Sequence, residues 1–546
     1  MLTVRFYQFI RDHAGPRMRW ILFTSVTSGL FMGITMAVIG HAVNEFVTEG
    51  SVSARSCLLF ILGATSYYWT LLLAARASTG AAFEAVSELQ LRLADKLRHS
   101  RFLEFQELDR GYVYSTLAGS KDIVIEASRH LTMCLSGAAM LIGAFAYGAT
   151  VSLIGAAVIG GVLAACGYFL QRFQHRGLLL EEQTATANRE FLASIKDLVG
   201  GFAELKIHRP KREDFYTNHV LVLAARNRAA RELVEALHAK GMAFFSAYAL
   251  LPMGAVVYLL PRLLNVSAEQ VVVLLAVAFF SLTPTVAFVT FISLSSRACL
   301  TLSTLQDFEN QLDALCDAES ASAPTPPAFE RIEIPDGLFR YHEGFSLHIE
   351  RFELRRGELA MLAGGNGSGK TTLMRVLAGL YPLASGDILV DGRPVREIGL
   401  ENYRSLCSVI FTDFHLFDTL WGIENPDPDR LRTMIDEMGL GGKLVVDDRR
   451  FSTVDLSSGQ RKRLAVLCAV IEDRPVLLFD EVAAGFDVRY REYFYRTLLP
   501  ALRAEGRTIL AISHDDRYFD VADRVLTMRE GTLDGAGPGA AAHTAA

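Results

Sequence analysis

Six long apolar segments occupy the N-terminal half of this 546-residue chain. Each is close to the length of about 20 residues that a helix needs to cross the hydrocarbon core of a bilayer. They lie at residues 19–43, 55–75, 131–150, 152–171, 242–261 and 270–296. Because that core offers no water to backbone N–H and C=O groups, each segment must form a helix. The first is too long for the apolar core of a signal peptide, so we expect it to be retained. The sequence therefore predicts an α-helical transmembrane domain of six spans over residues 1–315.

Basic residues concentrate in two long segments, one between the second and third spans and one between the fourth and fifth. The positive-inside rule places such segments in the cytoplasm. Their apolar residues recur at helical spacing with few helix breakers, as in AVSELQLRLADKLRHSRFLEF from Ala85. We therefore predict that the spans continue as long cytoplasmic helices. The alternative is amphipathic helices that lie on the membrane surface.

The composition of the chain changes after residue 315. The run CDAESASAPTPP is typical of a linker, which we place at residues 316–330. Short apolar strands then alternate with helical stretches over residues 331–535, which predicts an α/β domain. Residues 536–546 form a tail of low complexity that we expect to be disordered. A net charge of −6 gives no reason to expect a nucleic acid as partner.

The strongest chemical signal is a glycine-rich loop between an apolar strand, Leu359–Ala363, and a helix. It matches the phosphate-binding pattern G-x-x-x-x-G-K-[ST] in the required context. The glycines let the backbone wrap around phosphate oxygens, Lys370 reaches the β- and γ-phosphates, and the Thr371 hydroxyl binds Mg²⁺. The predicted nucleotide-binding residues of the loop are Gly364, Gly365, Asn366, Gly367, Ser368, Gly369, Lys370, Thr371 and Thr372.

Two later strands end in polar residues suited to phosphate chemistry. The strand Val476–Phe479 runs into Asp480, placed to hold Mg²⁺ through water, and Glu481, a candidate general base for the attacking water. The strand in RTILAISHD ends at His514, for which we favour a contact with the γ-phosphate over a purely structural role.

A second anion-binding feature is the segment LSSGQ, Leu456–Gln460, which opens an apolar helix. Free backbone N–H groups and the positive end of the helix dipole suit such a turn to bind phosphate. One chain therefore carries two phosphate-binding features.

Together these motifs resemble, in order and spacing, the ATPase domain of ABC transporters, which has an α/β P-loop fold. The six preceding spans resemble an ABC exporter half-transporter. The stretches GGNGSGKTTL, FTDFHLF, SSGQRKRLAVL and ISHDDRYFDVADR look most like the cyclic-peptide and siderophore exporter family. Members of that family move peptide antibiotics, peptide toxins or siderophore precursors across the bacterial inner membrane. The resemblance implies ATP hydrolysis coupled to transport, with ATP and Mg²⁺ as cofactors and membrane lipids around the spans.

The resemblance also implies a role for the second phosphate-binding feature. In ABC ATPases this signature segment faces the phosphate loop of a partner domain. Ser457, Ser458, Gly459 and Gln460 would then contact an ATP whose other contacts come from Lys370 of another chain. Since the chain has one ATPase domain, the working unit is expected to be a homodimer of two copies.

Three further positions follow the family pattern. Tyr341 matches the aromatic residue that stacks on adenine, with Phe339 as an alternative. Asp487 matches the Asp that closes the family's D-loop. Thr412 stands where most ABC ATPases place a Gln that senses Mg²⁺ and the attacking water, which leaves its part in hydrolysis open.

The resemblance places short coupling helices near Phe102–Gly111 and Leu198–Lys211, and Pro284 is expected to kink the sixth span. The cargo is expected to be a peptide-like molecule. Candidate cavity residues, which also suit the membrane interface, are Tyr67, Tyr68, Trp69, Tyr147 and Tyr248. A lipid or multidrug exporter is the runner-up, since its ATPase would look the same. A third possibility is an ATP-dependent regulator that transports nothing.

Overall fold

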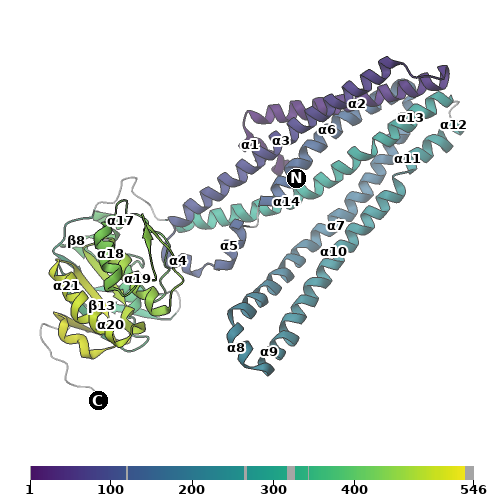
Figure 1. Ribbon diagram of the computed structural model, residues 1–546. Helices are drawn as coiled ribbons and strands as arrows, with labels where there is room; N and C mark the ends of the chain where they lie inside the picture. Colours follow the sequence, from purple (N-terminus) through teal and green to yellow (C-terminus); the bar gives the residue numbers. More distant parts are fainter. Residues whose placement is uncertain (1, 119–120, 264–266, 317–325, 342–343, 535–546) are drawn as a thin grey trace. The chain divides into compact units, whose positions relative to one another are not determined.

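The computed structural model describes residues 2–118, 121–263, 267–316, 326–341 and 344–534. The predicted tail and most of the predicted linker lie outside the described residues. The chain divides into two compact units. The first comprises Met1–Arg98 and Leu108–Ala314, and the second comprises His99–Glu107 and Leu315–Ala546. Figure 1 labels some of the helices and strands of each.

The first unit is helical. Its helices are α1 (Leu2–Ala14), α2 (Arg17–Glu49), α3 (Ala54–Arg98), α5 (Arg110–Ala118), α6 (Lys121–Val151), α7 (Leu153–Gly200), α8 (Phe202–Ile207), α9 (Arg209–Phe215), α10 (Leu221–Tyr248), α11 (Leu251–Gly254), α12 (Leu260–Leu263), α13 (Ala268–Phe280) and α14 (Leu282–Leu315), with π-helical turns at Tyr216–Val220 and Ala255–Leu259. Six of the described helical stretches are long and apolar enough to cross a membrane. The prediction of six spans is confirmed.

Small polar side chains hold α2, α3 and α6 together. The hydroxyls of Ser78 and Ser128 lie 2.7 Å apart, and those of Ser28 and Ser136 lie at the same distance. A Cβ atom on Gly29 would lie only 2.1 Å from the Ser136 carbonyl oxygen, so this position requires glycine. Helices pack in membranes through such small residues and interhelical hydrogen bonds. The hydrophobic effect does not drive this packing, because lipid tails are as apolar as the side chains themselves.

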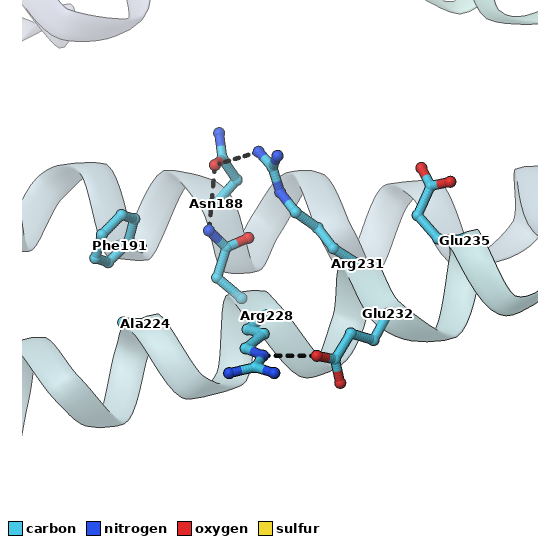
Figure 2. Close-up of a pocket in the computed structure, with 8 residues that line it drawn as sticks. Asn188, Phe191, Ala224, Arg228, Arg231, Glu232 and Glu235 are labelled. Atoms are coloured by element: carbon cyan, nitrogen blue, oxygen red, sulfur yellow. Dashed lines mark hydrogen bonds and ion pairs between the residues drawn. The ribbon is translucent and has the colours of Figure 1, made fainter.

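Helices α3 and α7 run without interruption well past their apolar stretches. This agrees with the prediction of long helices that continue the spans. Beyond its apolar part α7 packs against α10 along a polar seam (Figure 2). There Asn188 Oδ1 accepts hydrogen bonds from Arg231 at 2.9 Å and from Asn227 at 3.4 Å, beside a cavity of about 450 Å³.

The sixth span consists of two helices, α13 and α14, separated at Ser281. Pro284 falls in the first turn of α14, where a missing N–H leaves no helical hydrogen bond unmade. The span is therefore interrupted at Ser281, three residues before the proline, and the kink expected from Pro284 stays a prediction.

The second unit is built around two sheets. Its strands are β1 (Arg331–Ile334), β2 (Gly337–Arg340), β3 (Ser346–Ile349), β4 (Phe352–Arg355), β5 (Leu359–Gly364), β6 (Ser385–Gly386), β7 (Leu389–Val390), β8 (Arg393–Pro394), β9 (Cys407–Ile410), β10 (Val446–Asp447), β11 (Arg450–Phe451), β12 (Val476–Asp480), β13 (Thr508–Ile512), β14 (Arg524–Arg529) and β15 (Thr532–Asp534). The larger sheet has the order β6-β2-β3-β15-β14-β5-β13-β12-β9, and the smaller has the order β4-β1-β7-β8. β10 and β11 form a separate pair.

The second unit also contains helices. They are α4 (Phe102–Glu107), α15 (Lys370–Leu377), α16 (Val395–Ile398), α17 (Leu400–Arg404), α18 (Pro428–Glu437), α19 (Ser458–Ile471), α20 (Val488–Tyr493) and α21 (Leu499–Ala504), with 3₁₀ turns at Val482–Gly485 (η3) and Asp516–Val521 and a π-helical turn at Phe494–Leu498. Every residue of β12 and β13 is buried. Parallel strands covered on both faces are expected to be continuously apolar, and these are apolar except for Asp480 at the end of β12 and Thr508 at the start of β13.

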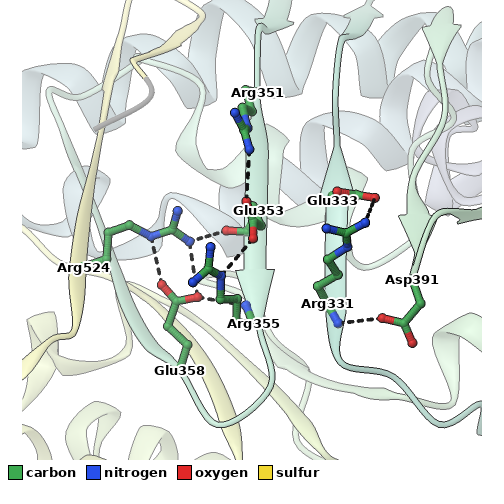
Figure 3. Close-up of polar contacts among 8 residues, drawn as sticks. All are labelled: Arg331, Glu333, Arg351, Glu353, Arg355, Glu358, Asp391 and Arg524. Atoms are coloured by element: carbon green, nitrogen blue, oxygen red, sulfur yellow. Dashed lines mark hydrogen bonds and ion pairs between the residues drawn. The ribbon is translucent and has the colours of Figure 1, made fainter. Parts of the chain in front are cut away.

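A network of ion pairs ties the smaller sheet to β14 (Figure 3). Glu353 of β4 accepts a hydrogen bond from Arg355 at 2.9 Å and lies 3.4 Å from Arg351. Arg524 of β14 binds Glu358 at 2.8 Å and also donates to the Glu353 carbonyl oxygen. The hydrogen bond from Arg355 is the main cause that holds the pKa of Glu353 below its usual value.

This network predicts an acid-sensitive contribution to stability. A carboxyl group whose pKa is lowered on folding stabilises the folded state above its unfolded pKa of about 4.3, and this contribution is lost as the pH falls through the lowered value. We expect Glu353→Gln to lower the free energy of unfolding at pH 7 by about 1 kcal/mol or less. Thermal unfolding measured from pH 7 to pH 3 should show this difference shrinking with acid. The exposed neighbour Glu350, changed to Gln, is the control, and an effect of Glu353→Gln that is independent of pH would contradict the assignment.

Candidate ATP-binding and hydrolysis site

The carboxyl ends of four neighbouring parallel strands, β5, β13, β12 and β9, lie at one edge of the larger sheet. In register, Leu362 of β5 pairs with Ile512 of β13, and Ile512 pairs with Asp480 of β12. The glycine-rich loop, His514 and Glu481 follow directly after these strands. Ligands of α/β sheets bind at this edge. The topology therefore gathers residues that are about 150 positions apart in the sequence.

The glycine-rich loop curls around the ammonium group of Lys370. Lys370 Nζ donates hydrogen bonds to the carbonyl oxygens of Gly364 at 3.0 Å and Gly365 at 2.9 Å, and the side chain is 5% exposed. Gly369, at φ 104°, precedes α15, and a Cβ atom there would lie 2.8 Å from the Phe345 ring. The N-terminus of α15 thus presents backbone N–H groups and a cation together, which suits it to hold a phosphate chain.

Glu481 and His514 meet beside this loop. His514 Nε2 lies 2.7 Å from Glu481 Oε1, and Lys370 Nζ lies 3.8 Å from the same oxygen. Glu481 adopts the left-handed region at φ 50°, which is uncommon for a residue other than glycine. The predicted base, the predicted γ-phosphate contact and the phosphate-binding lysine are therefore assembled at one point.

Asp480 is fully buried next to Glu481. Among the described residues, neither of its carboxylate oxygens has a hydrogen-bond partner of good geometry. Burial raises the pKa of Asp480, and the nearby hydroxyls of Thr371 and Thr412 oppose that shift. A buried carboxylate with unpartnered oxygens beside a threonine hydroxyl fits Mg²⁺, which prefers oxygen ligands. When bound, Mg²⁺ neutralises charge on the β- and γ-phosphates.

Thr412 follows β9 at the same edge. Its hydroxyl donates a hydrogen bond of 3.4 Å to the backbone oxygen of Asp480. The side chain therefore lies beside the predicted magnesium ligand, although a threonine reaches less far than the glutamine that most family members carry. Its role in hydrolysis stays a prediction.

Of the two aromatic candidates for adenine, only Tyr341 is partly exposed. Phe339 is 1% exposed and stacks on Tyr381 with ring centroids 4.9 Å apart. Tyr341 stands edge-on to both rings and donates its hydroxyl to that of Tyr381 at 3.3 Å. The geometry favours Tyr341 over Phe339. Sequence reasoning missed Phe345, a partly exposed ring against Gly369, for which the motifs contain no signal.

The signature segment forms the start of α19. Ser457 caps the helix, and its N–H donates to Gln460 Oε1 at 3.2 Å. Ser457 and Ser458 are exposed. Gly459 lies against η3, where a Cβ atom would stand 2.9 Å from the Gly485 carbonyl oxygen. The helix N-terminus is thus open to a ligand from outside the chain.

Asp487 follows η3 and caps α20 through a hydrogen bond from the Tyr490 N–H at 2.9 Å. That bond is the first cause that lowers the pKa of Asp487, and an ion pair with Arg463 of α19 adds to it. The predicted D-loop residue is therefore held against the helix that carries the signature segment.

Comparison with known proteins identifies the family. Residues 347–484 match the description of the ABC transporter domain, a range that includes Lys370, Thr412, the signature segment and Glu481. The chain is 28% identical to the ATP-binding protein SyrD of Pseudomonas syringae pv. syringae, with 94% of each chain covered. It is 26% identical to the ATP-dependent lipid A-core flippase of Burkholderia orbicola, over 69% of this chain and 65% of the flippase.

The fold of the whole chain agrees. A bacterial Atm1-family ABC exporter with ATP bound superimposes with a TM-score of 0.72, at 16% identity and with 94% of each chain covered. The chain is an ABC exporter half-transporter. This half-transporter is a multi-pass membrane protein that hydrolyses ATP in a cytoplasmic domain. The individual roles of Glu481, His514 and Tyr341 stay predictions.

We expect Glu481→Gln to lower ATP turnover by at least about 100-fold, because general-base catalysis contributes that much or more. ATP binding should remain, since Lys370 and the loop are unchanged. Steady-state ATPase assays and a nucleotide titration measure the two effects. Glu492→Gln, an exposed carboxylate of α20, is the matched control. Full turnover in Glu481→Gln would assign the base elsewhere.

The two aromatic residues should separate in mutagenesis. Tyr341→Ala should weaken ATP binding by about tenfold or more, because stacking of a base on an aromatic ring is worth about 1–3 kcal/mol. Phe339→Ala should instead lower the free energy of unfolding by about 3–5 kcal/mol, because it opens a cavity in the core. Nucleotide titration and thermal unfolding of both variants test this. A larger loss of ATP affinity than of stability in Phe339→Ala would reverse the assignment.

Proposed function

We propose that the half-transporter exports a cyclic or otherwise modified peptide across the bacterial inner membrane, powered by ATP hydrolysis with Mg²⁺ as cofactor. The observation that carries this proposal is that the similarity to SyrD spans 94% of both chains, the membrane spans as well as the ATPase. The motifs that resemble the cyclic-peptide and siderophore exporters, with Thr412 in place of glutamine, support the same cargo class.

A lipid exporter is the second candidate. The similarity to the lipid A-core flippase supports it, since that similarity also extends beyond the ATPase, over 69% of this chain. It covers less of this chain than the similarity to SyrD does. We therefore rank the peptide first.

The working unit of the proposal is a homodimer. Lys370, Glu481 and His514 of one copy would hold and hydrolyse an ATP whose γ-phosphate also contacts Ser458 and Gly459 of the other. Both halves of this site are present in the chain, and the exposed N-terminus of α19 supports a ligand contributed by a second copy. A two-fold axis then generates two equivalent sites. ATP binding closes the dimer, and hydrolysis removes the contacts that favour the closed state.

The first predicted coupling helix corresponds to α4, which belongs to the ATPase unit. Phe102 contributes to the apolar cluster around Tyr381, and the Tyr381 hydroxyl donates to Gln106 Oε1 at 2.6 Å. Arg375 of the phosphate-loop helix donates to the same hydroxyl at 2.9 Å. This chain of contacts joins the helix that begins at Lys370 to α4, and it supports α4 as a route from the nucleotide to the spans.

The second predicted coupling segment contains α8 and the start of α9. Phe202 and Ile207 of α8 are 61% and 76% exposed. Exposed apolar side chains on a cytoplasmic turn suit a contact with another surface. The assignment of this segment stays a prediction.

ATPase activity in lipid nanodiscs tests the cargo class. The native half-transporter and Glu481→Gln are assayed with cyclic peptides, siderophores, lipids and hydrophobic drugs. Stimulation by one peptide class, absent in Glu481→Gln, supports the proposal. Stimulation by lipids or drugs alone makes the second candidate the better one. Basal ATP hydrolysis that none of these compounds stimulates favours a regulatory role.

The α4 contact yields a prediction of its own. Gln106→Ala removes the acceptor for the Tyr381 hydroxyl, and a hydrogen bond is worth about 0.5–1.5 kcal/mol. We expect basal ATP turnover to stay within about twofold while cargo-stimulated turnover falls by up to about tenfold. Gln106→Glu keeps the acceptor oxygen and is the matched control. Equal losses of basal and stimulated turnover would contradict a role in coupling.

A further inference from the structure

The helix that carries the signature segment, α19, also contacts η3, the turn that follows the predicted general base Glu481. Lys462 of α19 donates a hydrogen bond of 3.3 Å from Nζ to the backbone oxygen of Glu481. One turn earlier, Gly459 packs against Gly485 at the other end of η3. Arg463 then pairs with Asp487, just past η3. The segment from Glu481 to Asp487 is thus held by α19 at both of its ends.

The backbone of Glu481 needs such support. Its φ of 50° lies in the left-handed region, where a side chain crowds the backbone, and such conformations persist only where the surroundings enforce them. The same residue places Oε1 2.7 Å from His514 and 3.8 Å from Lys370. A rotation of its backbone would therefore carry the carboxylate away from both.

Lys462 is placed to supply that support, whereas its neighbour is not. The stem of Lys462 runs along η3, since a Cβ atom on Gly485 would lie 3.4 Å from Lys462 Cδ. The side chain is partly buried there. Arg461, one position earlier on the helix, is exposed. Two adjacent basic residues on one helix therefore differ in whether they reach Glu481 and η3.

We infer that Lys462 is a positioning residue for Glu481 and transmits the occupancy of the signature segment to the base of the same chain. The inference rests on the proposed homodimer, in which the signature segment binds the ATP held by the other copy. A phosphate bound at Ser458 and Gly459 fixes the conformation of the first turn of α19. Because Lys462 contacts the Glu481 backbone and Gly459 contacts Gly485, the conformation of η3 is fixed as well. Each copy then hydrolyses its own ATP with a base that is set by the ATP of its partner.

The first test compares Lys462→Met, Lys462→Arg and the matched control Arg461→Met in the full-length half-transporter in nanodiscs. We expect Lys462→Met to lower kcat by about tenfold with the Kd for ATP changed by less than about twofold, because it moves the base and leaves the phosphate loop intact. Lys462→Arg, which retains a donor, should recover most of the activity, and Arg461→Met should match the native protein. Native kcat in Lys462→Met, or a parallel loss of ATP binding in it, would overturn the inference.

The second test separates positioning from transmission with the variant Ser458→Ala, alone and combined with Lys462→Met. If the signature segment acts through Lys462, the double variant should have a kcat within about twofold of the lower single variant. A double variant whose loss equals the product of the two single losses would overturn the transmission.

Light scattering of the native protein with ATP tests the homodimer on which the inference rests. A dimer supports the transmission. A monomer with native turnover would overturn the homodimer and the transmission with it, while a loss of kcat in Lys462→Met would still support the positioning role.

Discussion

The hydrogen-bond ladder between the parallel strands β5, β13, β12 and β9 is the constraint on which the ATPase site depends. It sets the carboxyl ends of these strands side by side at one edge of the sheet. The residues that follow the strands are therefore also placed at that edge. Lys370, Glu481 and His514 lie close together there although they are far apart in the sequence. Complete burial of β12 and β13 makes the ladder rigid, and a rigid edge holds a base and a phosphate-binding cation in fixed relation.

The charged groups at this edge of the sheet suit the phosphates of ATP and a Mg²⁺ ion. Lys370 is satisfied by two carbonyl oxygens, whereas the buried Asp480 has no comparable partner among the described residues. A buried carboxylate left in that state is costly unless a cation joins it. The start of α19, where Ser457 and Ser458 are exposed, is the positive end of a helix dipole. An ATP with its Mg²⁺ would complement both, with the cation at Asp480 of one copy and the γ-phosphate at the start of α19 of the other, which is the physical basis of the proposal that two copies share each ATP.

Much of the molecule could be predicted from sequence. The six spans follow from length and hydropathy, because hydrocarbon imposes helices on the backbone. The phosphate loop follows from its glycines and lysine, and the candidate base from an acidic residue at a strand end. Phe345 and the contact of Lys462 with Glu481 could not be predicted. Phe345 lies outside the motifs, and although Lys462 lies within SSGQRKRLAVL, that pattern does not indicate its contact with Glu481. Both features depend on how loops and helices from distant parts of the chain approach each other.

The sequence by itself determined the kinds of structure and chemistry this half-transporter contains, since local patterns of apolar, glycine and charged residues are sufficient for spans, strands and a phosphate loop. Only the tertiary structure decided between candidates of the same kind. It buried Phe339 in the core and left Tyr341 partly exposed, although both are aromatic residues at the same strand end. It placed the Lys462 side chain against Glu481 and left the Arg461 side chain exposed to solvent. Such choices depend on packing between segments far apart in the sequence, which no local pattern records.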